Sequence, residues 1–367
     1  MKIPNNTLGL FVISIIVLIR SGKIVFAILF STIYPFYYLI NSLFLFLDKI
    51  FIPSLREIKI NNPVLIMGVN RSGTTFFHKV LSNLDQFQSN TTWDYIFPSI
   101  ILRKILNPVY CLLVKFQLTR VEGRKGGHSV KINKIEEDEM LLFLHRLDSQ
   151  WISNHFIPWY KTDKKFSNLS SKFLINNSSN MNRHRDSVDF LKQFWKKQLY
   201  LSNKSEILSK ANPFIFKGQT IQSTFPNIKM IFLIRDPKEV LVSYFSMQEK
   251  IKFGNRLNTN ERILYRESAY KEIQIWYKET EKLIKELKPD SFMVIKYSDL
   301  MQNFQWVMNN VSAFLDLQQS KHFKELLSEY DPSNYSSEHK NFDLEYFNLL
   351  EKKIHQDFDF VYKKYFN

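Results

Sequence analysis

The chain has 367 residues and one cysteine, Cys111, which excludes a fold held by intrachain disulfides, and the Cys/His spacing of a zinc site is absent. Hydrophobic residues make up 45% of the sequence and aromatic residues 15%, which favours a folded chain with a well-filled core, in one large domain or two ordinary ones. The formal net charge of +15 suits an anionic ligand or substrate, nucleic acid or a membrane surface.

The N-terminal region holds two apolar stretches. Residues 24–47 include no charged side chain, and as a helix this run of 24 residues extends about 36 Å, enough to cross a hydrocarbon core of roughly 30 Å. Pro35 lies within the run, where a kink is expected. The earlier run, residues 8–19, either spans the bilayer when it is extended back to Ile3 or lies at the interface.

The charges beside these stretches predict a topology. Arg20 and Lys23 precede the long run, and the positive-inside rule then places this flank in the cytoplasm and the rest of the chain in a lumen, for which we expect the Golgi. The alternative is a monotopic anchor, in which both stretches pack on the folded domain. We expect residues 1–50 to form a membrane anchor, residues 51–62 a linker and residues 63–367 a catalytic domain.

The folded domain begins with a strand, a loop and a helix. Residues 64–67 are a short apolar run that reads as a buried strand, and a glycine-bounded loop from Gly68 to Gly73 follows. The next apolar side chains fall on one face of a helix: Phe76, Phe77, Val80, Leu81 and Leu84. In this geometry the amides of the loop and of the first helical turn point at one spot, where they favour an anion.

The loop has the spacing of a nucleoside-triphosphate P-loop with one change. Thr74 occupies the position of the lysine that reaches the β- and γ-phosphates, and the cation lies instead at Arg71. A simple ATPase or GTPase is therefore disfavoured, and a differently placed anion is expected. The alternative is a glycine turn that only starts a core helix.

A carboxylate follows in an aromatic setting. Asp94 lies between Trp93 and Tyr95, where partial desolvation suits a general base. The alternative is a cap for the helix that follows. Residues 99–118 read as a helical stretch that Pro108 interrupts.

The middle of the chain adds further titratable residues. Residues 123–127 form a basic loop, followed by His128, and residues 136–139 are four acidic residues that open a helix over residues 140–147. Residues 161–187 are polar and are expected to form a surface excursion, before an amphipathic helix over residues 188–199.

Two more strands end in charged residues. Residues 206–210 read as a strand that ends at Lys210, and residues 229–234 as a buried strand that stops before Arg235. Pro237 starts the next helix, which places Ser243 two turns into it. Ligands of open parallel sheets bind at the carboxyl ends of the strands, where these side chains are expected.

The last part of the chain is expected to alternate helices with one strand. A long helix covers residues 260–287 and a strand covers residues 292–295. Ser298 is the expected cap of a helix that reaches residue 315, and a final helix is expected over residues 344–365.

Together these residues resemble the sulfotransferase superfamily, which uses 3′-phosphoadenosine 5′-phosphosulfate (PAPS), and within it the group of bacterial-type and tyrosylprotein sulfotransferases. Residues 70–75 are similar to the family's 5′-phosphosulfate loop, and residues 231–237 with Ser243 are similar to its 3′-phosphate site. The resemblance covers roughly residues 61–330. It implies an α/β fold of three layers, P-loop-like, with a central parallel sheet flanked by helices, plus the N-terminal membrane helix or helices.

The resemblance also implies a donor site without a metal ion. A bidentate arginine contact suits the 3′-phosphate. The residues implied to hold PAPS are Arg71, Ser72, Gly73, Thr74, Thr75, Arg235 and Ser243.

The implied catalytic residues are Lys210, which neutralises the leaving oxygen, Arg71 and a base. Cytosolic members of the family use a histidine two residues after the lysine, where this chain has Asn212. The membrane-linked branches use a carboxylate, and Asp94 falls where many members carry the glutamate of a Trp-Glu pair. Other candidates for the base are His128, Glu137 and Asp138.

The function expected from this resemblance is transfer of a sulfuryl group from PAPS to a hydroxyl or amine, by in-line displacement. The acceptor can be a carbohydrate, a tyrosine, a lipid or a small molecule, the membrane is a further partner, and no nucleic acid is expected. One alternative is a P-loop kinase or other phosphotransferase, with Asp236 as a magnesium ligand. The other is a non-catalytic, membrane-anchored anion binder.

Overall fold

The computed structural model describes residues 6–122, 130–163, 166–167, 180–202, 204–249, 257–317, 323, 327–330, 332 and 342–366. The predicted basic loop and His128 lie outside the described residues, so that candidate for the base has no structural account.

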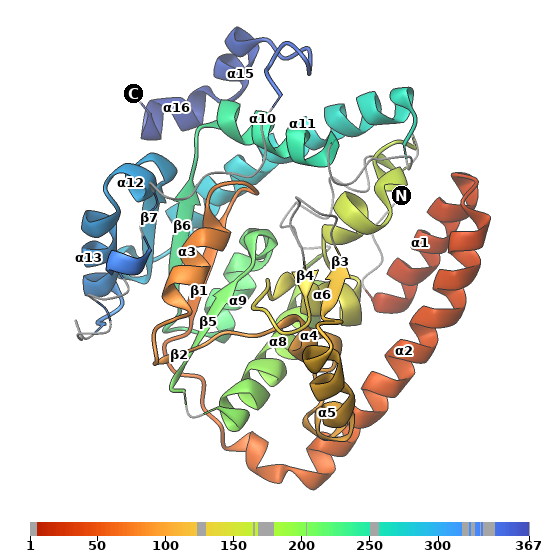
Figure 1. The fold of residues 1–367 in the computed structure, drawn as a ribbon. Coiled ribbons are helices and arrows are strands. Elements are labelled where there is room, and N and C mark those ends of the chain that lie inside the picture. Colours follow the sequence, from red (N-terminus) through yellow and green to blue (C-terminus); the bar gives the residue numbers. More distant parts are fainter. Residues whose placement is uncertain are drawn as a thin grey trace.

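A parallel sheet of five strands forms the centre of the fold, in the order β2-β5-β1-β6-β7 (Figure 1). All four strand pairs are parallel, and β1 lies between β5 and β6. The strands are β1 Val64–Gly68, β2 Phe87–Gln88, β5 Glu206–Lys210, β6 Lys229–Ile234 and β7 Phe292–Lys296. A separate antiparallel pair joins β3 Arg120–Glu122 to β4 Val130–Lys131. The parallel sheet confirms the predicted α/β class.

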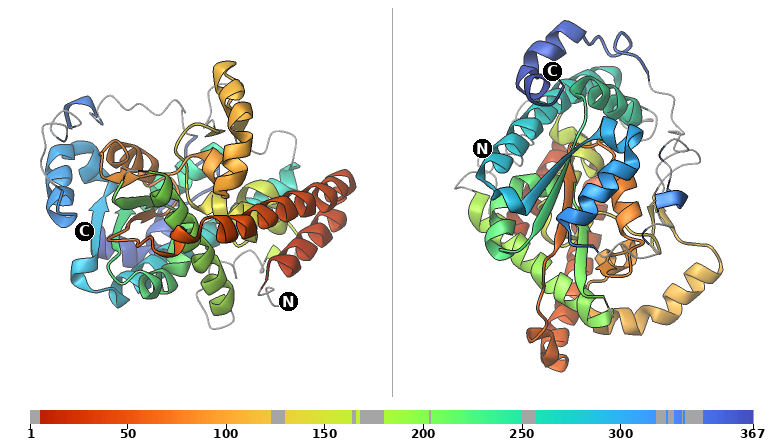
Figure 2. Two further views of the ribbon diagram at one scale, coloured as in Figure 1. Left: turned by 90° about the horizontal axis from the view of Figure 1, so that it is seen from below. Right: turned by 90° about the vertical axis from the view of Figure 1, so that its left-hand side faces the viewer.

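Helices cover both faces of this sheet (Figures 1 and 2). The helices are α1 Thr7–Arg20, α2 Ile24–Phe51, α3 Thr74–Leu81, α4 Thr92–Ile96, α5 Ile100–Lys115, α6 Glu139–Arg146, α8 Met181–Leu201, α9 Gly218–Thr224, α10 Pro237–Met247, α11 Thr259–Glu286, α12 Tyr297–Gln302, α13 Phe304–Phe314, α15 Glu351–Asp357 and α16 Asp359–Tyr365.

The alternation of side chains along β1 builds two cores. Val64 and Ile66 lie in the smaller core with apolar residues of α3, α12 and α13. Leu65 and Met67 lie in the larger core with residues of α8, α9, α10 and α11. Because a strand covered on both faces buries every side chain, all five residues of β1 are buried, which explains the unbroken apolar run in the sequence.

Three predicted helix boundaries were wrong. Helix α5 continues through Pro108, and Lys104, whose carbonyl loses its helical donor to that proline, is an exposed residue. Ser298 is not a cap, since α12 already begins at Tyr297 and breaks at Asn303, whose backbone is non-helical (φ −128°, ψ 43°). The last helix begins at Glu351 rather than at residue 344 and is divided at Phe358.

The polar stretch before residue 188 was also misread in part. Helix α8 begins at Met181, and one face of its first two turns, with Arg183, His184 and Ser187, is buried. Arg183 Nε donates to Asp148 Oδ1 at 2.7 Å, and Ser187 Oγ donates to the other carboxylate oxygen at 2.6 Å. The buried acceptor on Asp148 explains why polar residues lie here, because a buried charge needs partners of this kind.

The two N-terminal helices form a hairpin along one side of the domain (Figure 1). Within the described residues, α2 is the one helix that is long and apolar enough to cross a membrane, judged by length and composition. The helix continues through Pro35 and ends at Phe51.

Candidate active site

The loop between β1 and α3 has the geometry of an anion cradle. Ser72 is buried, and its hydroxyl donates to the carbonyl of Val69 at 2.7 Å, which closes the loop on itself. Gly73 takes a left-handed conformation (φ 86°) immediately before α3. The first amides of α3 have no acceptor within the helix, so they and the helix dipole favour an anion in front of the loop.

The two predicted glycine positions are close-packed. A Cβ on Gly73 would lie 2.8 Å from the ring of Tyr297, and a Cβ on Gly68 would lie 2.6 Å from the carbonyl oxygen of Leu233. Since real Cβ atoms do not approach so closely, both positions require glycine. Tyr297, at the start of α12, was not predicted as a site residue.

The two predicted anion motifs meet in the structure. Arg71, which has a left-handed backbone (φ 76°), donates from Nε to Ser243 Oγ at 3.0 Å. Arg235 donates from Nη1 to the carbonyl oxygen of Arg71 at 2.8 Å. Arg71 thus contacts Arg235, 164 positions later in the sequence, and Ser243, 172 positions later, at the carboxyl ends of β1 and β6.

The guanidinium of Arg235 is held in place by two further contacts. Its Nε donates to Glu239 at 2.8 Å, and its central carbon lies 4.1 Å from the centre of the Tyr297 ring. The carbonyl of Arg235 accepts from the Tyr277 hydroxyl at 2.6 Å. A cation fixed on an aromatic face at a strand end is prepared for an anionic ligand.

Lys210 links the loop to an acidic residue. Its Nζ donates to Thr75 Oγ1 at 2.8 Å and forms an ion pair with Glu137. The lysine side chain is 2% exposed and the Glu137 side chain 14% exposed, so the pair is largely shielded from solvent. Burial, with the charge of Lys210 as the second cause, lowers the pKa of His78 to about 3, which leaves a neutral imidazole behind the loop.

Asp138 fixes the segment that carries Glu137. Its amide donates to the carbonyl of Lys210 at 3.0 Å, and its buried carboxylate accepts from Tyr95 at 2.5 Å and Trp195 at 2.9 Å. Asn90 also donates to this carboxylate, at 3.2 Å. Burial raises the pKa of Asp138, and these donors oppose that effect. Asp138 therefore holds Glu137 beside Lys210.

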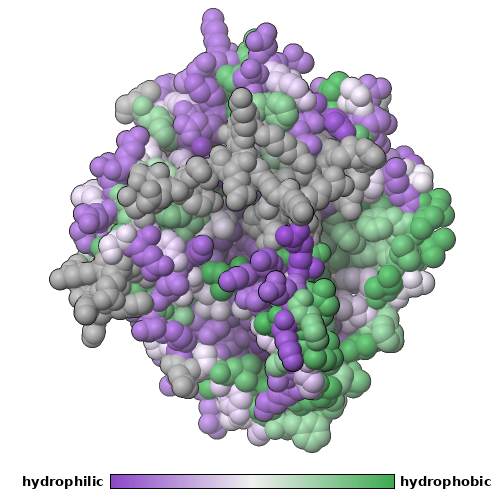
Figure 3. All heavy atoms as spheres, in the orientation of Figure 1, coloured by the Kyte–Doolittle hydropathy of each residue, from purple (hydrophilic) through white to green (hydrophobic). Residues whose placement is uncertain are grey.

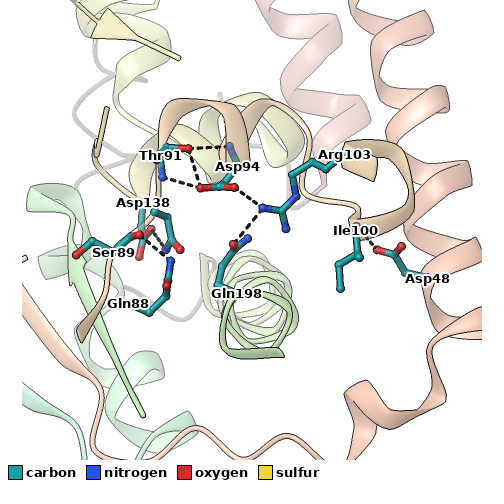
Figure 4. Close-up of polar contacts among 10 residues, drawn as sticks. Asp48, Gln88, Ser89, Thr91, Asp94, Ile100, Arg103, Asp138 and Gln198 are labelled. Carbon is teal, nitrogen blue, oxygen red and sulfur yellow. Dashed lines mark hydrogen bonds and ion pairs between the residues drawn. The ribbon is translucent and has the colours of Figure 1, made fainter. Parts of the chain in front are cut away.

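Asp94 lies in a different network (Figure 4). Its carboxylate accepts from the amide of Thr91 at 2.8 Å and from the Thr91 hydroxyl at 2.7 Å, and it forms an ion pair with Arg103. Thr91 and Asp94 make a capping box at the start of α4. Arg103 also donates to Gln198 at 3.2 Å. Through Thr91 and Arg103, the Asp94 carboxylate thus links α4, α5 and α8.

Asp236 caps a helix rather than offering a metal ligand. Its side chain accepts from the amide of Lys238 at 2.7 Å, and Pro237 occupies the first turn of α10, as predicted. The hydroxyl of Tyr362 donates to the same oxygen at 2.7 Å. Among the described residues, no group of three or more His, Cys, Asp or Glu side chains is arranged to hold a metal ion.

Sequence motifs pointed to most of this site, and its acidic member, Glu137, was only one of several candidates for the base. Glu137 stood in an acidic run typical of a helix start, and nothing in the sequence tied it to Lys210, 73 positions away. Tyr297 lies next to Ser298, the expected helix cap, and was given no role. The spatial partners of both residues come from distant strand ends.

Comparison with known proteins agrees with the fold. Residues 63–321 match the sequence model described as the Sulfotransferase family. The structure is similar to the crystal structure of sulfotransferase STF1 from Mycobacterium tuberculosis, with a TM-score of 0.66 and 14% identity over 96% of this chain and 90% of that one. It is also similar to sulfotransferase STF9 from Mycobacterium avium, with a TM-score of 0.62 and 12% identity over 86% and 79% of the two chains. A search of curated proteins gave no match.

Proposed function

Because this chain belongs to the sulfotransferase family and acts in sulfotransfer, we propose that its donor is PAPS and its acceptor a hydroxyl- or amine-bearing molecule. The observation that carries this proposal is the contact between the two anion motifs, in which Arg71 donates to Ser243 and Arg235 donates to the Arg71 carbonyl. This arrangement offers two anion sites side by side. PAPS carries a 5′-phosphosulfate and a separate 3′-phosphate, so its charge matches both sites.

The donor set fits PAPS better than a nucleoside triphosphate. Thr74 replaces the P-loop lysine that reaches the β- and γ-phosphates of a nucleoside triphosphate, and the cation of this loop is Arg71 instead. In our proposal the loop residues Arg71 to Thr75 hold the 5′-phosphosulfate. Arg235 and Ser243 hold the 3′-phosphate by charge-assisted hydrogen bonds.

Lys210 and Glu137 have complementary roles in the proposed reaction. Glu137 accepts the proton of the acceptor hydroxyl, whose oxygen forms the new bond to sulfur as the bond from sulfur to the phosphate oxygen breaks. Lys210 stabilises the negative charge that develops on that leaving oxygen, and Thr75 positions the ammonium group. The products are the sulfated acceptor and 3′-phosphoadenosine 5′-phosphate (PAP).

Glu137 is preferred over Asp94 as the base for a geometric reason. Its carboxylate contacts the ammonium of Lys210, which itself contacts the donor loop, whereas the Asp94 carboxylate holds Thr91 and Arg103. A base must reach the acceptor while Lys210 reaches the leaving oxygen, and a carboxylate already next to Lys210 meets this condition. Asp94 remains the rival candidate from the sequence, and substitution distinguishes the two.

The acceptor class is left open among carbohydrate, tyrosine, lipid and small molecule. Membrane association through the N-terminal helices forms part of the proposal, because α2 has the length and composition of a membrane helix. Neither the structure nor the comparisons support the expected location in the Golgi lumen, and it is not carried forward.

The experiment is an acceptor screen with sulfur-labelled PAPS, run with and without Mg²⁺, using the full chain and Lys210→Ala. We expect metal-independent transfer to one acceptor class, a turnover at least about 10²-fold lower in the variant and PAP binding that changes less. The same acceptors are tested with phosphorus-labelled ATP, and Mg²⁺-dependent transfer from ATP would support the kinase alternative. PAP binding without transfer to any acceptor would support the non-catalytic binder.

A further inference from the structure

Helix α2 has two different sides. One side is an exposed apolar stripe that runs from the first turn of the helix to its last. The exposed side chains, which recur every three or four residues, are Val25, Ile28, Leu29, Ile33, Phe36, Leu39, Leu43, Phe46 and Ile50. Figure 3 shows apolar atoms gathered over the α1–α2 hairpin, on the right of the molecule.

The opposite side of α2 is fastened to the domain along nearly the whole helix. The buried residues Ala27, Phe30, Asn41 and Asp48 span about 32 Å of helix axis. Between them, Tyr37 donates to the carbonyl of Ile96 at 2.8 Å and lies 3.0 Å from His145 Nε2. A helix held in this way lies against the protein over a length close to the thickness of a hydrocarbon core.

The contact at Asp48 makes this attachment difficult to break. The carboxylate is buried and forms an ion pair of 2.7 Å with Lys197 of α8. It also accepts from Ser99 at 2.9 Å and from the amides of Ile100 and Ile101 at 3.0 and 3.1 Å. Withdrawing α2 into a bilayer would leave Lys197 buried without its partner, a change that typically costs about 3–5 kcal/mol.

Helix α5 extends the apolar surface. Asp48 binds the start of α5 to α2, and beyond its first turn α5 exposes one apolar face. The exposed residues of this face and of the segment after it are Ile105, Val109, Leu112, Phe116, Leu118 and Val121. Figure 3 shows a second apolar area in the lower centre, over the part of the molecule where α5 lies in Figure 1.

The exposed charges on these segments are positive, although Arg20 at the end of α1 is paired with Asp163 of another segment at 3.2 Å. Within residues 6–56 the one acidic residue is Asp48, which is buried, and residues 97–121 contain no acidic residue. Besides Arg103, which pairs with Asp94, the exposed or half-exposed cations of these segments are Arg20, Lys23, Lys49, Arg56, Lys104, Lys115 and Arg120. An apolar face bordered by cations matches the acyl chains and anionic headgroups of one bilayer leaflet. Another protein surface would not require this bias.

We propose that the protein is monotopic: the α1–α2 hairpin and α5 lie in the plane of one leaflet of an anionic bilayer, and α2 does not cross it. The alignment with STF1 covers 96% of this chain, which leaves only about 15 of its 367 residues outside, so the hairpin falls largely within the shared fold. In our proposal, the hairpin is part of the domain, and the apolar stripe takes the place of a membrane span.

Cysteine accessibility tests the orientation. In a Cys111→Ser background, Lys23→Cys and Lys49→Cys place single thiols near the two ends of α2, and Lys288→Cys is a matched control on the domain surface. The full chain is bound to the outside of sealed phosphatidylcholine–phosphatidylserine vesicles and treated with a membrane-impermeant maleimide. We expect all three thiols to react from outside. Protection of one end until the vesicles are lysed would mean that α2 spans, and would overturn the proposal.

Vesicle flotation tests whether lipid covers the apolar face of α2. Phe36→Asp with Leu43→Asp should reduce flotation at least about tenfold, while the thermal unfolding midpoint stays near that of the parent. Ile263→Asp, on an exposed position of α11, is the matched control and should float normally. Omission of phosphatidylserine should also weaken binding. If the parent fails to float and sediments as a dimer that the double variant dissociates, a second copy covers this face and the lipid proposal is wrong.

Discussion

At the scale of single residues, the assignment of Glu137 as the base is the part of the mechanism that substitution tests most directly. Glu137→Gln removes the carboxylate beside Lys210 while keeping its shape, and turnover should fall about 10²–10⁴-fold. PAP affinity should be unchanged within a few-fold, since the loop contacts remain. Steady-state kinetics with the best acceptor, together with PAP titration, separates the two effects.

Asp94→Asn is the matched control for that prediction. It weakens the capping box and the pair with Arg103, so we expect a loss of about 0.5–2 kcal/mol of stability with turnover per folded molecule nearly unchanged. The opposite pattern, in which Asp94→Asn loses turnover and Glu137→Gln does not, would restore Asp94 as the base.

Glu139, two residues after Glu137, predicts a pH dependence of stability. Burial raises the pKa of Glu139 to about 8, from an ordinary value of 4.5. Between these values the folded chain keeps a proton that the unfolded chain has released. The contribution of this group to the free energy of unfolding therefore falls by about 1.4 kcal/mol per pH unit as the pH rises from 4.5 to 8.

Glu139→Gln removes this dependence. The free energy of unfolding of the variant, measured with denaturant and compared with that of the parent, should therefore increase between pH 5 and pH 8. Glu267→Gln replaces an exposed glutamate of α11 and should show no such trend. An equal effect of Glu139→Gln at both pH values would show that the buried carboxyl titrates normally.

At the scale of elements, the turn from β1 into α3 depends on a glycine. Gly73→Ala meets both a left-handed backbone and the Tyr297 ring at 2.8 Å, so it should displace the loop or the ring. Because that ring supports Arg235, we expect PAP affinity to fall at least about tenfold. Isothermal titration of the purified full chain provides the measurement.

Gly22→Ala is the control for backbone strain. It has a similar positive φ of 69°, and a Cβ there has nothing within 4 Å. It should lower stability by about 1–2 kcal/mol without affecting PAP. If Gly73→Ala behaves like Gly22→Ala, the close approach of Tyr297 has no role in donor binding.

The elements also show where sequence patterns are sufficient. Strands β1 and β6 were predicted closely because strands buried on both faces leave unbroken apolar runs. Strand β5 was also predicted closely, from the shorter apolar pair Ile207 and Leu208. The break at Asn303 and the continuation of α5 past Pro108 could not be predicted in this way. Both depend on the surroundings of the helix in the folded chain, which the local sequence pattern does not contain.

At the scale of the whole molecule, the contact between Arg71 and Ser243 was predictable from two motifs and the rule that ligands bind at strand ends. The attachment of α2 to the domain was not predictable from the sequence. An apolar face looks the same in sequence whether lipid or protein covers it, and the residues that decide the case, Asp48 and Tyr37, find their partners 50 or more positions away. Glu137 was ambiguous for the same reason, since its partner Lys210 is distant in the chain.

The most direct measurement of the central claim is a comparison of PAP with adenosine 5′-phosphate, which lacks the 3′-phosphate, on the wild-type chain and on Arg235→Ala, without Mg²⁺. A charged hydrogen bond is worth about 1.5–3 kcal/mol, so the wild type should bind PAP at least roughly tenfold more tightly, and Arg235→Ala should remove most of that preference. The variant should bind adenosine 5′-phosphate within about twofold of the wild type, which shows that the loop held through the Arg71 carbonyl is intact. If the variant weakens both ligands equally, or if ATP with Mg²⁺ binds the wild type as tightly as PAP does, the assignment of a PAPS site is contradicted.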